Sequence, residues 1–300
     1  MTFLGGIETG GTKCVCMIAE NPSNIAAQTQ FDTEEPDVTV EKIVAFFREN
    51  QKRLGIQLPA VGLASFGPID LHPASPQYGF VTSTPKPGWR DFDLLGSIQQ
   101  SLDIPMMFDT DTNGAALGEY EWGAGRGLDQ FIYLTIGTGI GGGALIGGKP
   151  VHGLVHPEMG HILLPHDREK DPFEGACPFH GDCFEGLASG PAIEKRWGIP
   201  GHQLPPEHPA WDIEAQHLAS GLHCLICSFS PQRLILGGGV MKKPGLLENV
   251  RSKVTESLAD YIDSDTIRND MQEYIVAPEL GDNAGVLGAI VMAKRLIEIS

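Results

Sequence analysis

The sequence predicts an α/β protein of two lobes. Short apolar segments with strand character alternate with segments of helical spacing through the 300 residues, and 41% hydrophobic against 20% charged residues is ordinary for a globular protein. A unit of strand, glycine- and threonine-rich turn and return strand occurs twice, with its turns at residues 8–13 and 137–143. Two copies of one supersecondary unit predict two related lobes with a cleft between them.

The first half of the chain opens with a predicted hairpin, in which an apolar segment at 3–7 enters the first glycine turn and resumes at 14–18. A loop rich in proline follows at 70–90. The other elements expected in this half are strands at 60–65 and 104–108 and helices at 38–54 and 113–122.

The second half repeats the opening design, with a strand at 131–136, the turn at 137–143 and a return strand at 144–146. Cys224 and Cys227 lie in an apolar helix at 218–229, where we expect them to pack in the core. A strand at 233–236 leads into a glycine turn, and a helix at 284–299 follows residues 281–283. We expect a first lobe at 1–112, with the C-terminal helix 286–300 packing back on it, and a second lobe at 113–285.

The charge and the cysteines limit the possible functions. Lys and Arg number 21 against 38 Asp and Glu, and the net charge of −17 disfavours nucleic acids and anionic membranes as partners. No apolar run is long enough for a transmembrane helix, and the N-terminus has no leader pattern, so we expect a cytoplasmic protein. In that reducing compartment the six cysteines are expected to be core thiols or metal ligands.

The two glycine turns are candidate phosphate sites. Glycine lets a backbone bring its N–H groups close to a phosphate, and threonine adds a hydroxyl donor. Either turn alone could be an ordinary hairpin turn, but the repetition and the threonines favour phosphate binding. The candidate residues are Gly10, Gly11, Thr12, Lys13, Gly137, Thr138 and Gly139.

Two other nucleotide motifs do not fit. Residues 137–142 match the glycine spacing of the dinucleotide fingerprint, but that fingerprint requires a helix directly afterwards, and residues 144–148 indicate strand and turn. The GxxxxGK[ST] pattern of the P-loop is absent from the sequence. The sequence therefore disfavours a Rossmann dehydrogenase and a P-loop NTPase.

A group of soft ligands predicts a zinc site. Cys177, His180 and Cys183 recur at intervals of three residues, and His161 precedes them. Four nitrogen and sulfur ligands are what a closed tetrahedral zinc site requires. Buried thiols and polar loop histidines are the alternative, but the surrounding loop, rich in glycine and proline, has little core of its own, which favours a metal.

Asp111 is a candidate catalytic base. It follows a predicted strand and precedes a predicted helix, and phosphoryl transfer to an alcohol uses a base near the acceptor hydroxyl. Asp109 is the rival carboxylate. In the alternative, structural role, Asp111 or Thr112 caps the following helix.

Together these motifs resemble the repressor, open reading frame, kinase (ROK) family of bacterial sugar kinases, and more narrowly its zinc-containing fructokinases, over nearly the whole chain. Residues 8–13 resemble the family's DxGGT phosphate motif, with Glu8 in place of Asp. The other matching segments are 110–119 (TDTNGAALGE, similar to NDANAAALGE), 134–141 (LTIGTGIG), 156–161 (HPEMGH, similar to ExGH) and 177–185 (CPFHGDCFE, similar to the zinc loop, with His180 where cysteine is common).

The resemblance implies an actin/hexokinase-like (ribonuclease H-like) pair of α/β lobes with a zinc-stabilised loop, ATP and Mg²⁺ as cofactors, and a homodimer. It selects Asp111 over Asp109 as the general base. The sugar ligands that it implies are Thr84, Thr110, Asp111, Glu158 and Glu185, the zinc ligands are His161, Cys177, His180 and Cys183, and the adenosine-side residues are Gly237, Gly238, Gly239 and Asn283.

Fructose, phosphorylated at its 6-hydroxyl, is the expected substrate because residues 82–89 (TSTPKPGW) resemble the fructokinase branch, with Trp89 suited to a sugar lid. An exposed proline loop is the alternative for this segment. Glucose, mannose and N-acetylmannosamine are the alternative sugars. A sugar-responsive repressor is the rival class, but it needs a DNA-binding segment before the first phosphate motif, and that motif begins at Glu8.

Overall fold

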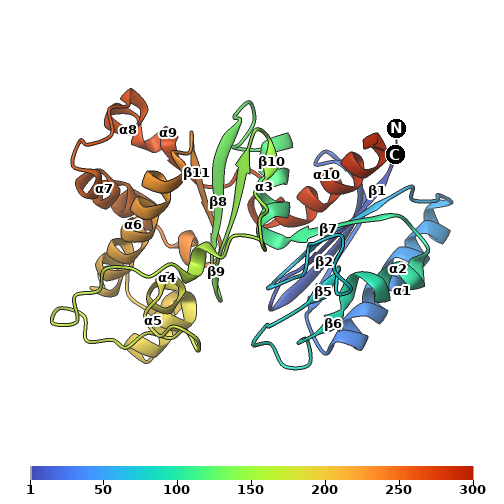
Figure 1. Cartoon of the computed structure of the whole chain (residues 1–300), viewed down its shortest axis with the longest axis horizontal. Coiled ribbons are helices and arrows are strands. Elements are labelled where there is room, and N and C mark those ends of the chain that lie inside the picture. Colours follow the sequence, from blue (N-terminus) through green and yellow to red (C-terminus); the bar gives the residue numbers. More distant parts are fainter. Residues whose placement is uncertain (1, 300) are drawn as a thin grey trace. The chain divides into compact units, whose positions relative to one another are not determined.

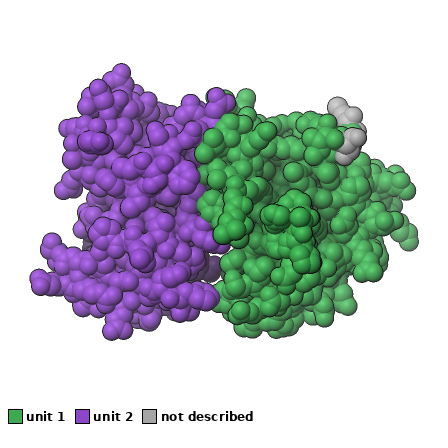
Figure 2. Space-filling model, in the orientation of Figure 1, with its two compact units in different colours: residues 1–127, 143–157, 279–300 green, residues 128–142, 158–278 purple. Residues whose placement is uncertain are grey.

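The computed structural model describes residues 2–299, which form two compact units (Figure 2). Unit 1 comprises residues 1–127, 143–157 and 279–300, and unit 2 comprises residues 128–142 and 158–278. The units divide the chain differently from the expected boundary at 112, because the helix after that boundary packs on the first sheet and the chain returns to unit 1 twice. No helix within residues 2–299 combines the length and the apolar character that crossing a bilayer requires.

The first sheet has the strand order β3-β2-β1-β4-β7, and all five strands belong to unit 1. The opening hairpin pairs β1 with β2 in antiparallel register, as the sequence predicts, while β1, β4 and β7 run parallel. The carboxyl ends of β1, β4 and β7 therefore meet at one edge of the sheet. The strands are β1 (Leu4–Thr9), β2 (Lys13–Asn21), β3 (Asn24–Asp32), β4 (Val61–Ser65) and β7 (Met106–Thr110).

Both faces of this sheet are covered, which explains why β2 is apolar at nearly every position (Figure 1). Successive strand residues point to opposite faces. Cys14, Cys16 and Ile18 pack in the cluster beneath α1 (Pro36–Leu54) and α2 (Leu94–Leu102), whereas Val15 and Met17 pack against α10 (Ala284–Ile299). The same α10 also lies against α3 (Asp111–Trp122).

Glycine allows α3 and α10 to approach closely. A Cβ atom on Gly288 would overlap the carbonyl oxygen of Gly114, and one on Gly118 would be 3.0 Å from the nitrogen of Gly288. The N-terminal turns of the two helices are thereby held beside β1 and β4, at the sheet edge where the first phosphate motif and Asp111 lie.

The second sheet has the order β10-β9-β8-β11-β12, with β8 and β11 parallel. Its return strand begins at Ile140, three residues before the expected turn ends, so the glycines of that segment partly belong to the strand. The strands are β8 (Gln130–Ile136), β9 (Ile140–Ile146), β10 (Lys149–Pro150), β11 (Leu234–Gly237) and β12 (Ile275–Val276). The accompanying helices are α4 (Phe184–Ala188), α5 (Gly190–Trp197), α6 (Ala210–Phe229), α7 (Leu246–Leu258), α8 (Asp265–Asn269) and α9 (Met271–Tyr274).

Short elements complete the fold. A two-stranded ribbon pairs β5 (Phe80–Val81), within the loop that the sequence indicates at 70–90, with β6 (Phe92–Asp93), just after that loop. The 3₁₀ turns within residues 2–299 are η1 (Met159–His161), η2 (Gly201–Gln203), η3 (Val240–Lys242) and η4 (Gly281–Asn283). The sequence did not indicate β3, α2, α5 or α7 as separate elements.

We expect Gly288→Ala to lower the free energy of unfolding by about 1–3 kcal/mol, because its methyl group has to push α10 away from the backbone of α3. Urea denaturation followed by circular dichroism would measure the change. Gly153→Ala is the matched control, since the nearest atom to its Cβ would be 3.9 Å away. Equal stability of the two variants would contradict the tight crossing.

Candidate active site

The sequence left open whether Asp111 caps a helix, and the structure gives that role to Thr110. The Thr110 hydroxyl accepts the backbone N–H of Asn113 at 3.1 Å, as an N-cap side chain does. Asp111 is the first residue of α3, and its Oδ1 accepts the N–H of Thr112 at 2.8 Å. The Asp111 carboxylate is thus held in place without being the helix cap.

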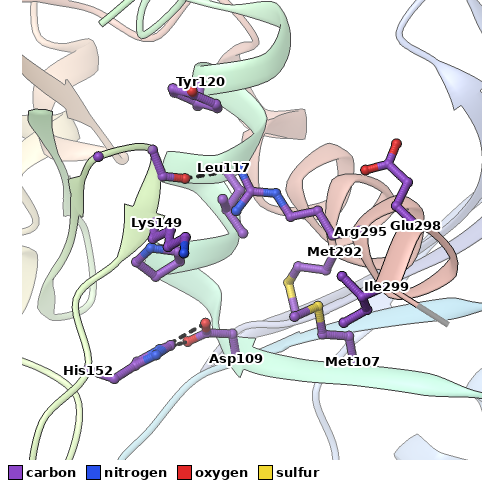
Figure 3. Close-up of a pocket in the computed structure, with 13 residues that line it drawn as sticks. Met107, Asp109, Leu117, Tyr120, Lys149, His152, Met292, Arg295, Glu298 and Ile299 are labelled. Atoms are coloured by element: carbon purple, nitrogen blue, oxygen red, sulfur yellow. Dashed lines mark hydrogen bonds and ion pairs between the residues drawn. The ribbon is translucent and has the colours of Figure 1, made fainter. Parts of the chain in front are cut away.

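Asp109, the rival carboxylate, is a structural group. It is 6% exposed, and its Oδ1 accepts the N–H of Thr110 and the side-chain amide of Asn113, both at 2.7 Å. Its Oδ2 is 3.0 Å from Nε2 of His152 (Figure 3), and the hydrogen bond that the histidine donates to Asp109 raises the pKa of His152. With both oxygens engaged, Asp109 ties the end of β7 to α3 and to the segment after β10.

The electrostatics of Asp111 differ from those of Asp109. Removal from water raises the pKa of Asp111 to about 7, and the negative charge of Glu8 adds to the shift. Burial likewise raises the pKa of Glu8 to about 7, although Lys13 and the N–H of Val286 oppose the change. Glu8 Oε2 is buried without a hydrogen-bond partner. A carboxylate that titrates near neutrality is suited to proton transfer at physiological pH.

The first glycine turn leaves its backbone accessible. Gly10 donates its N–H to the carbonyl of Lys13 at 2.9 Å, and a Cβ atom on Gly11 would meet nothing within 4 Å. Lys86 Nζ donates to the carbonyl of Gly11 at 2.8 Å. This cation was not identified from the sequence, because its partner lies 75 residues away and no local pattern links them.

Two further glycine turns lie at one edge of the second sheet, because they follow the parallel strands β8 and β11. Gly238 has φ +92°, and a side chain there would overlap the backbone of Ile136. Gly137, Thr138 and Gly139 therefore lie beside Gly237, Gly238 and Gly239 in unit 2, whereas Asn283 lies in unit 1, where its Oδ1 accepts Gln28 Nε2 at 2.9 Å.

Glu185 lies against the second phosphate turn. Its Oε2 accepts the N–H of Ile140 at 2.9 Å, and a Cβ atom on Gly139 would be 2.6 Å from the same oxygen. Glu185 lies on α4, directly after the cysteine-containing loop. Glu158 immediately precedes η1, and its carbonyl accepts the N–H of His161 at 3.0 Å. Both candidate sugar carboxylates thus adjoin the candidate metal ligands.

The four predicted metal ligands come together, with one ligand atom from each within 4.8 Å of every other. Nδ1 of His161 is 3.8 Å from Sγ of Cys177 and 3.6 Å from Sγ of Cys183, and Nδ1 of His180 is 3.7 Å from Sγ of Cys177. A tetrahedral zinc ion with ordinary bond lengths would separate sulfur and nitrogen ligands by about 3.6 Å. The donor set and its spacing therefore fit a zinc ion.

Three side chains, those of Trp89, Cys224 and Cys227, differ from expectation. Trp89 is fully buried between Phe66 and Phe92, and its indole N–H donates to the carbonyl of Glu34 at 2.9 Å, so it is a core residue and not a lid. Thr84 is 6% exposed, and its Oγ1 accepts the N–H of Lys86 at 3.3 Å. Cys227 is exposed and Cys224 is partly exposed, contrary to core packing, because α6 turns this stripe outward near its C-terminus.

Unit 1 also contains a cavity of about 520 Å³ between β7, α3, α10 and the segment around β10 (Figure 3). The Asp109–His152 pair and Arg295, which donates to the carbonyl of Gly148 at 3.1 Å, lie in its wall. Of the residues that the sequence offered for the site, the rival carboxylate Asp109 lines this cavity, whereas Asp111 and the implied phosphate, sugar and metal ligands do not.

We expect Asp111→Asn to stabilise the protein at alkaline pH. The folded state keeps a proton on Asp111 up to about pH 7, while the unfolded chain releases it near the ordinary value of 3.8, so stability falls as pH rises between these values. Asparagine does not titrate. Its stabilising effect in urea denaturation should therefore be about 1–2 kcal/mol larger at pH 8 than at pH 5.5, after allowance for partial solvent screening of Asp111. A pH-independent effect would contradict the raised pKa.

Comparison with known proteins agrees with these motifs. The ROK family profile matches residues 4–296. The chain is 42% identical to a fructokinase of Zymomonas mobilis, with 96% of this chain and 95% of that protein covered. A ROK hexokinase structure from Thermus thermophilus superposes with a TM-score of 0.80 at 25% identity, covering all of both chains. A ROK glucokinase from Streptomyces griseus, in complex with glucose and AMPPNP, superposes with a TM-score of 0.75 at 27% identity, covering 98% of this chain and 99% of that one. The chain belongs to the ROK family.

Proposed function

We propose that this protein is a sugar kinase that transfers the γ-phosphoryl group of ATP to the 6-hydroxyl of fructose. The observation that carries the proposal is the carboxylate of Asp111, whose pKa is raised to about 7 at the junction of β7 and α3. The 42% identity to a fructokinase over nearly the whole chain supports fructose as the acceptor.

Asp111 acts as the general base in this proposal. As the 6-hydroxyl attacks the γ-phosphorus, its proton passes to the Asp111 carboxylate and the bond to the ADP oxygen breaks. The hydrogen bond from the N–H of Thr112 fixes the orientation of the Asp111 carboxylate, whose oxygens accept the proton. Closure of a cleft over the reactants would exclude water and so limit ATP hydrolysis.

The glycine turns hold ATP. We assign the phosphates to residues 10–13 and 137–139, and the adenosine side to residues 237–239 and Asn283. The AMPPNP in the related glucokinase supports ATP as donor. Lys86, positioned at Gly11, adds positive charge beside the first turn. Mg²⁺ would neutralise charge on the phosphate oxygens, and Glu8 is the carboxylate nearest to the first turn in sequence.

The sugar ligands are Glu158, Glu185, Thr84 and Thr110. Glu158 and Glu185 would accept hydrogen bonds from sugar hydroxyls, and a zinc ion held by His161, Cys177, His180 and Cys183 would fix the segments that carry them. The zinc ion supplies a structural crosslink in a loop with little core. We place the reaction in the cytoplasm, where ATP is available and cysteine ligands stay reduced, and we propose a homodimer from the family resemblance.

The substrate assignment is tested by a coupled ADP-release assay over a panel of hexoses. We expect the highest kcat/KM with fructose and lower values with glucose, mannose and N-acetylmannosamine. Formation of fructose 1-phosphate instead of fructose 6-phosphate, resolved by NMR of the product, would overturn the assigned acceptor hydroxyl.

We expect Asp111→Asn to reduce kcat by a factor of at least about 100 while fructose binding, measured by calorimetry, changes little, because the amide cannot accept the proton. Asp103→Asn is the matched control, since it makes the same change at an exposed site with φ +54°, a conformation that asparagine tolerates.

In the wild type, kcat/KM should rise with pH through about 7 as Asp111 loses its proton. Glu8→Gln should move this rising limb of the pH profile to lower pH, because it removes a neighbouring negative charge. An unmoved limb would exclude coupling between the two carboxylates.

The purified protein should contain about one zinc ion per chain by plasma mass spectrometry, because four ligands meet at spacings suited to the ion. Cys183→Ser should lose this metal and raise the KM for fructose, whereas Cys227→Ser, at an exposed position, should keep both unchanged. Full zinc content in Cys183→Ser would remove the cysteine from the ligand set.

A further inference from the structure

The loop between His161 and Cys183 is attached to the rest of unit 2 at a second place, Asp171, which lies ten residues after His161 and six before Cys177. Asp171 lies in this loop and is 9% exposed. Its Oδ2 is 3.1 Å from a guanidinium nitrogen of Arg196, 3.0 Å from Nε2 of His217 and 3.3 Å from Nε2 of His166. We call Asp171, Arg196, His217 and His166 the Asp171 cluster.

Asp171 and Arg196 form an ion pair within the Asp171 cluster. Burial alone would raise the pKa of Asp171, but the hydrogen bond from His217 and the charge of Arg196 outweigh it, so the net shift is downward and the group is a carboxylate. Burial lowers the pKa of His217, which is therefore neutral near pH 7 and donates its Nε2–H. Burial raises the pKa of the neighbouring Glu214 well above its ordinary value, although the charge of Arg196 opposes the shift. Asp171 is thus the counter-ion of the buried Arg196.

Arg196 links the Asp171 cluster to the helix that carries Glu185. One guanidinium nitrogen of Arg196 binds Asp171, and the other donates to the carbonyl of Leu187, in α4, at 3.1 Å. The guanidinium also lies 4.3 Å from the ring centre of Phe173, in the same loop as Asp171. Because α4 spans little more than one turn, fixing Leu187 fixes Glu185 as well.

Glu185 in turn contacts the second phosphate turn through the N–H of Ile140. A continuous set of partly buried contacts therefore leads from Asp171 through Arg196 and α4 to Glu185, and all of it lies in unit 2. None of these contacts passes through a candidate metal ligand.

We infer that Asp171 is a positioning residue for sugar binding: through Arg196 it holds α4, and hence Glu185, in the orientation that the acceptor sugar requires, independently of the metal. This inference rests on the proposed function. Two separate sets of contacts then order the loop. The candidate metal ligands hold its ends, and the Asp171 cluster holds its middle and α4.

The test compares Asp171→Asn with Asp167→Asn. Both remove one negative charge from the same loop, but the side chain of Asp167 is 52% exposed and pairs with Lys170 at the surface. In Asp171→Asn we expect the KM for fructose to rise about tenfold, with kcat within about twofold of the wild type, because an interaction common to ground state and transition state weakens. Zinc content should stay at the wild-type value, and Asp167→Asn should behave as the wild type in both measurements.

Hydrogen–deuterium exchange gives a readout that needs no substrate. Peptides containing Ile140 and residues 183–189 should exchange faster in Asp171→Asn than in Asp167→Asn. The N–H of Ile140 is bonded to the Glu185 side chain, and amides at the end of α4 are bonded within that helix, so both depend on how firmly α4 is held. Arg196→Met should have a similar effect, and the double variant should add little to either single one, since the residues act in one network. If Asp171→Asn folds poorly, His217→Gln takes its place. It removes only one donor to Asp171 and should give a smaller change in exchange in the same direction.

Equal exchange and equal fructose KM in Asp171→Asn and Asp167→Asn would overturn the inference. Loss of zinc in parallel with the rise in KM would also overturn it, because Asp171 would then act through the metal site. Failure of the wild type to phosphorylate fructose would instead refute the proposed function, and the exchange experiment would still decide whether Asp171 orders α4.

Discussion

The close crossing of α3 and α10 is the constraint from which the candidate site in unit 1 follows. Gly114, Gly118 and Gly288 let the two backbones approach, so the first turns of both helices lie beside the ends of β1 and β4. One helix thereby carries Asp111, and the other offers the N–H of Val286 to Glu8. Larger side chains at the crossing would separate these groups.

The raised pKa values of Glu8 and Asp111 are an electrostatic cost of this arrangement. Two carboxylates with little access to water each make ionisation of the other less favourable, and Glu8 keeps an unpartnered oxygen. Such a site opposes folding stability and favours proton transfer near neutral pH. Asp109, two residues before Asp111, has a structural role instead, since both of its carboxylate oxygens are bonded to other groups of the fold.

In unit 2, the loop between His161 and Cys183 has little apolar core, so polar contacts must order it. The four candidate metal ligands come together from this loop and its two ends, and the buried carboxylate of Asp171 joins its middle to α5 and α6. Both devices are polar, and both converge on the short α4 with Glu185. Glu185 in turn contacts the second glycine turn, because its Oε2 accepts the N–H of Ile140.

The sequence by itself determined the features that depend on neighbours along the chain. Hairpin turns, the buried strands and the helix at the C-terminus follow from glycine placement and apolar spacing. The four candidate metal ligands, which the structure brings together, stand out in the sequence because three of them recur within seven residues. Only the tertiary structure decided the roles that depend on distant partners. Asp109 is occupied by His152 from 43 residues away, Trp89 is enclosed by Phe66 and by the carbonyl of Glu34, and Lys86 reaches Gly11 across 75 residues. The direction in which a side chain points, inward or toward solvent, is set by what packs against its element, and local sequence does not contain that partner.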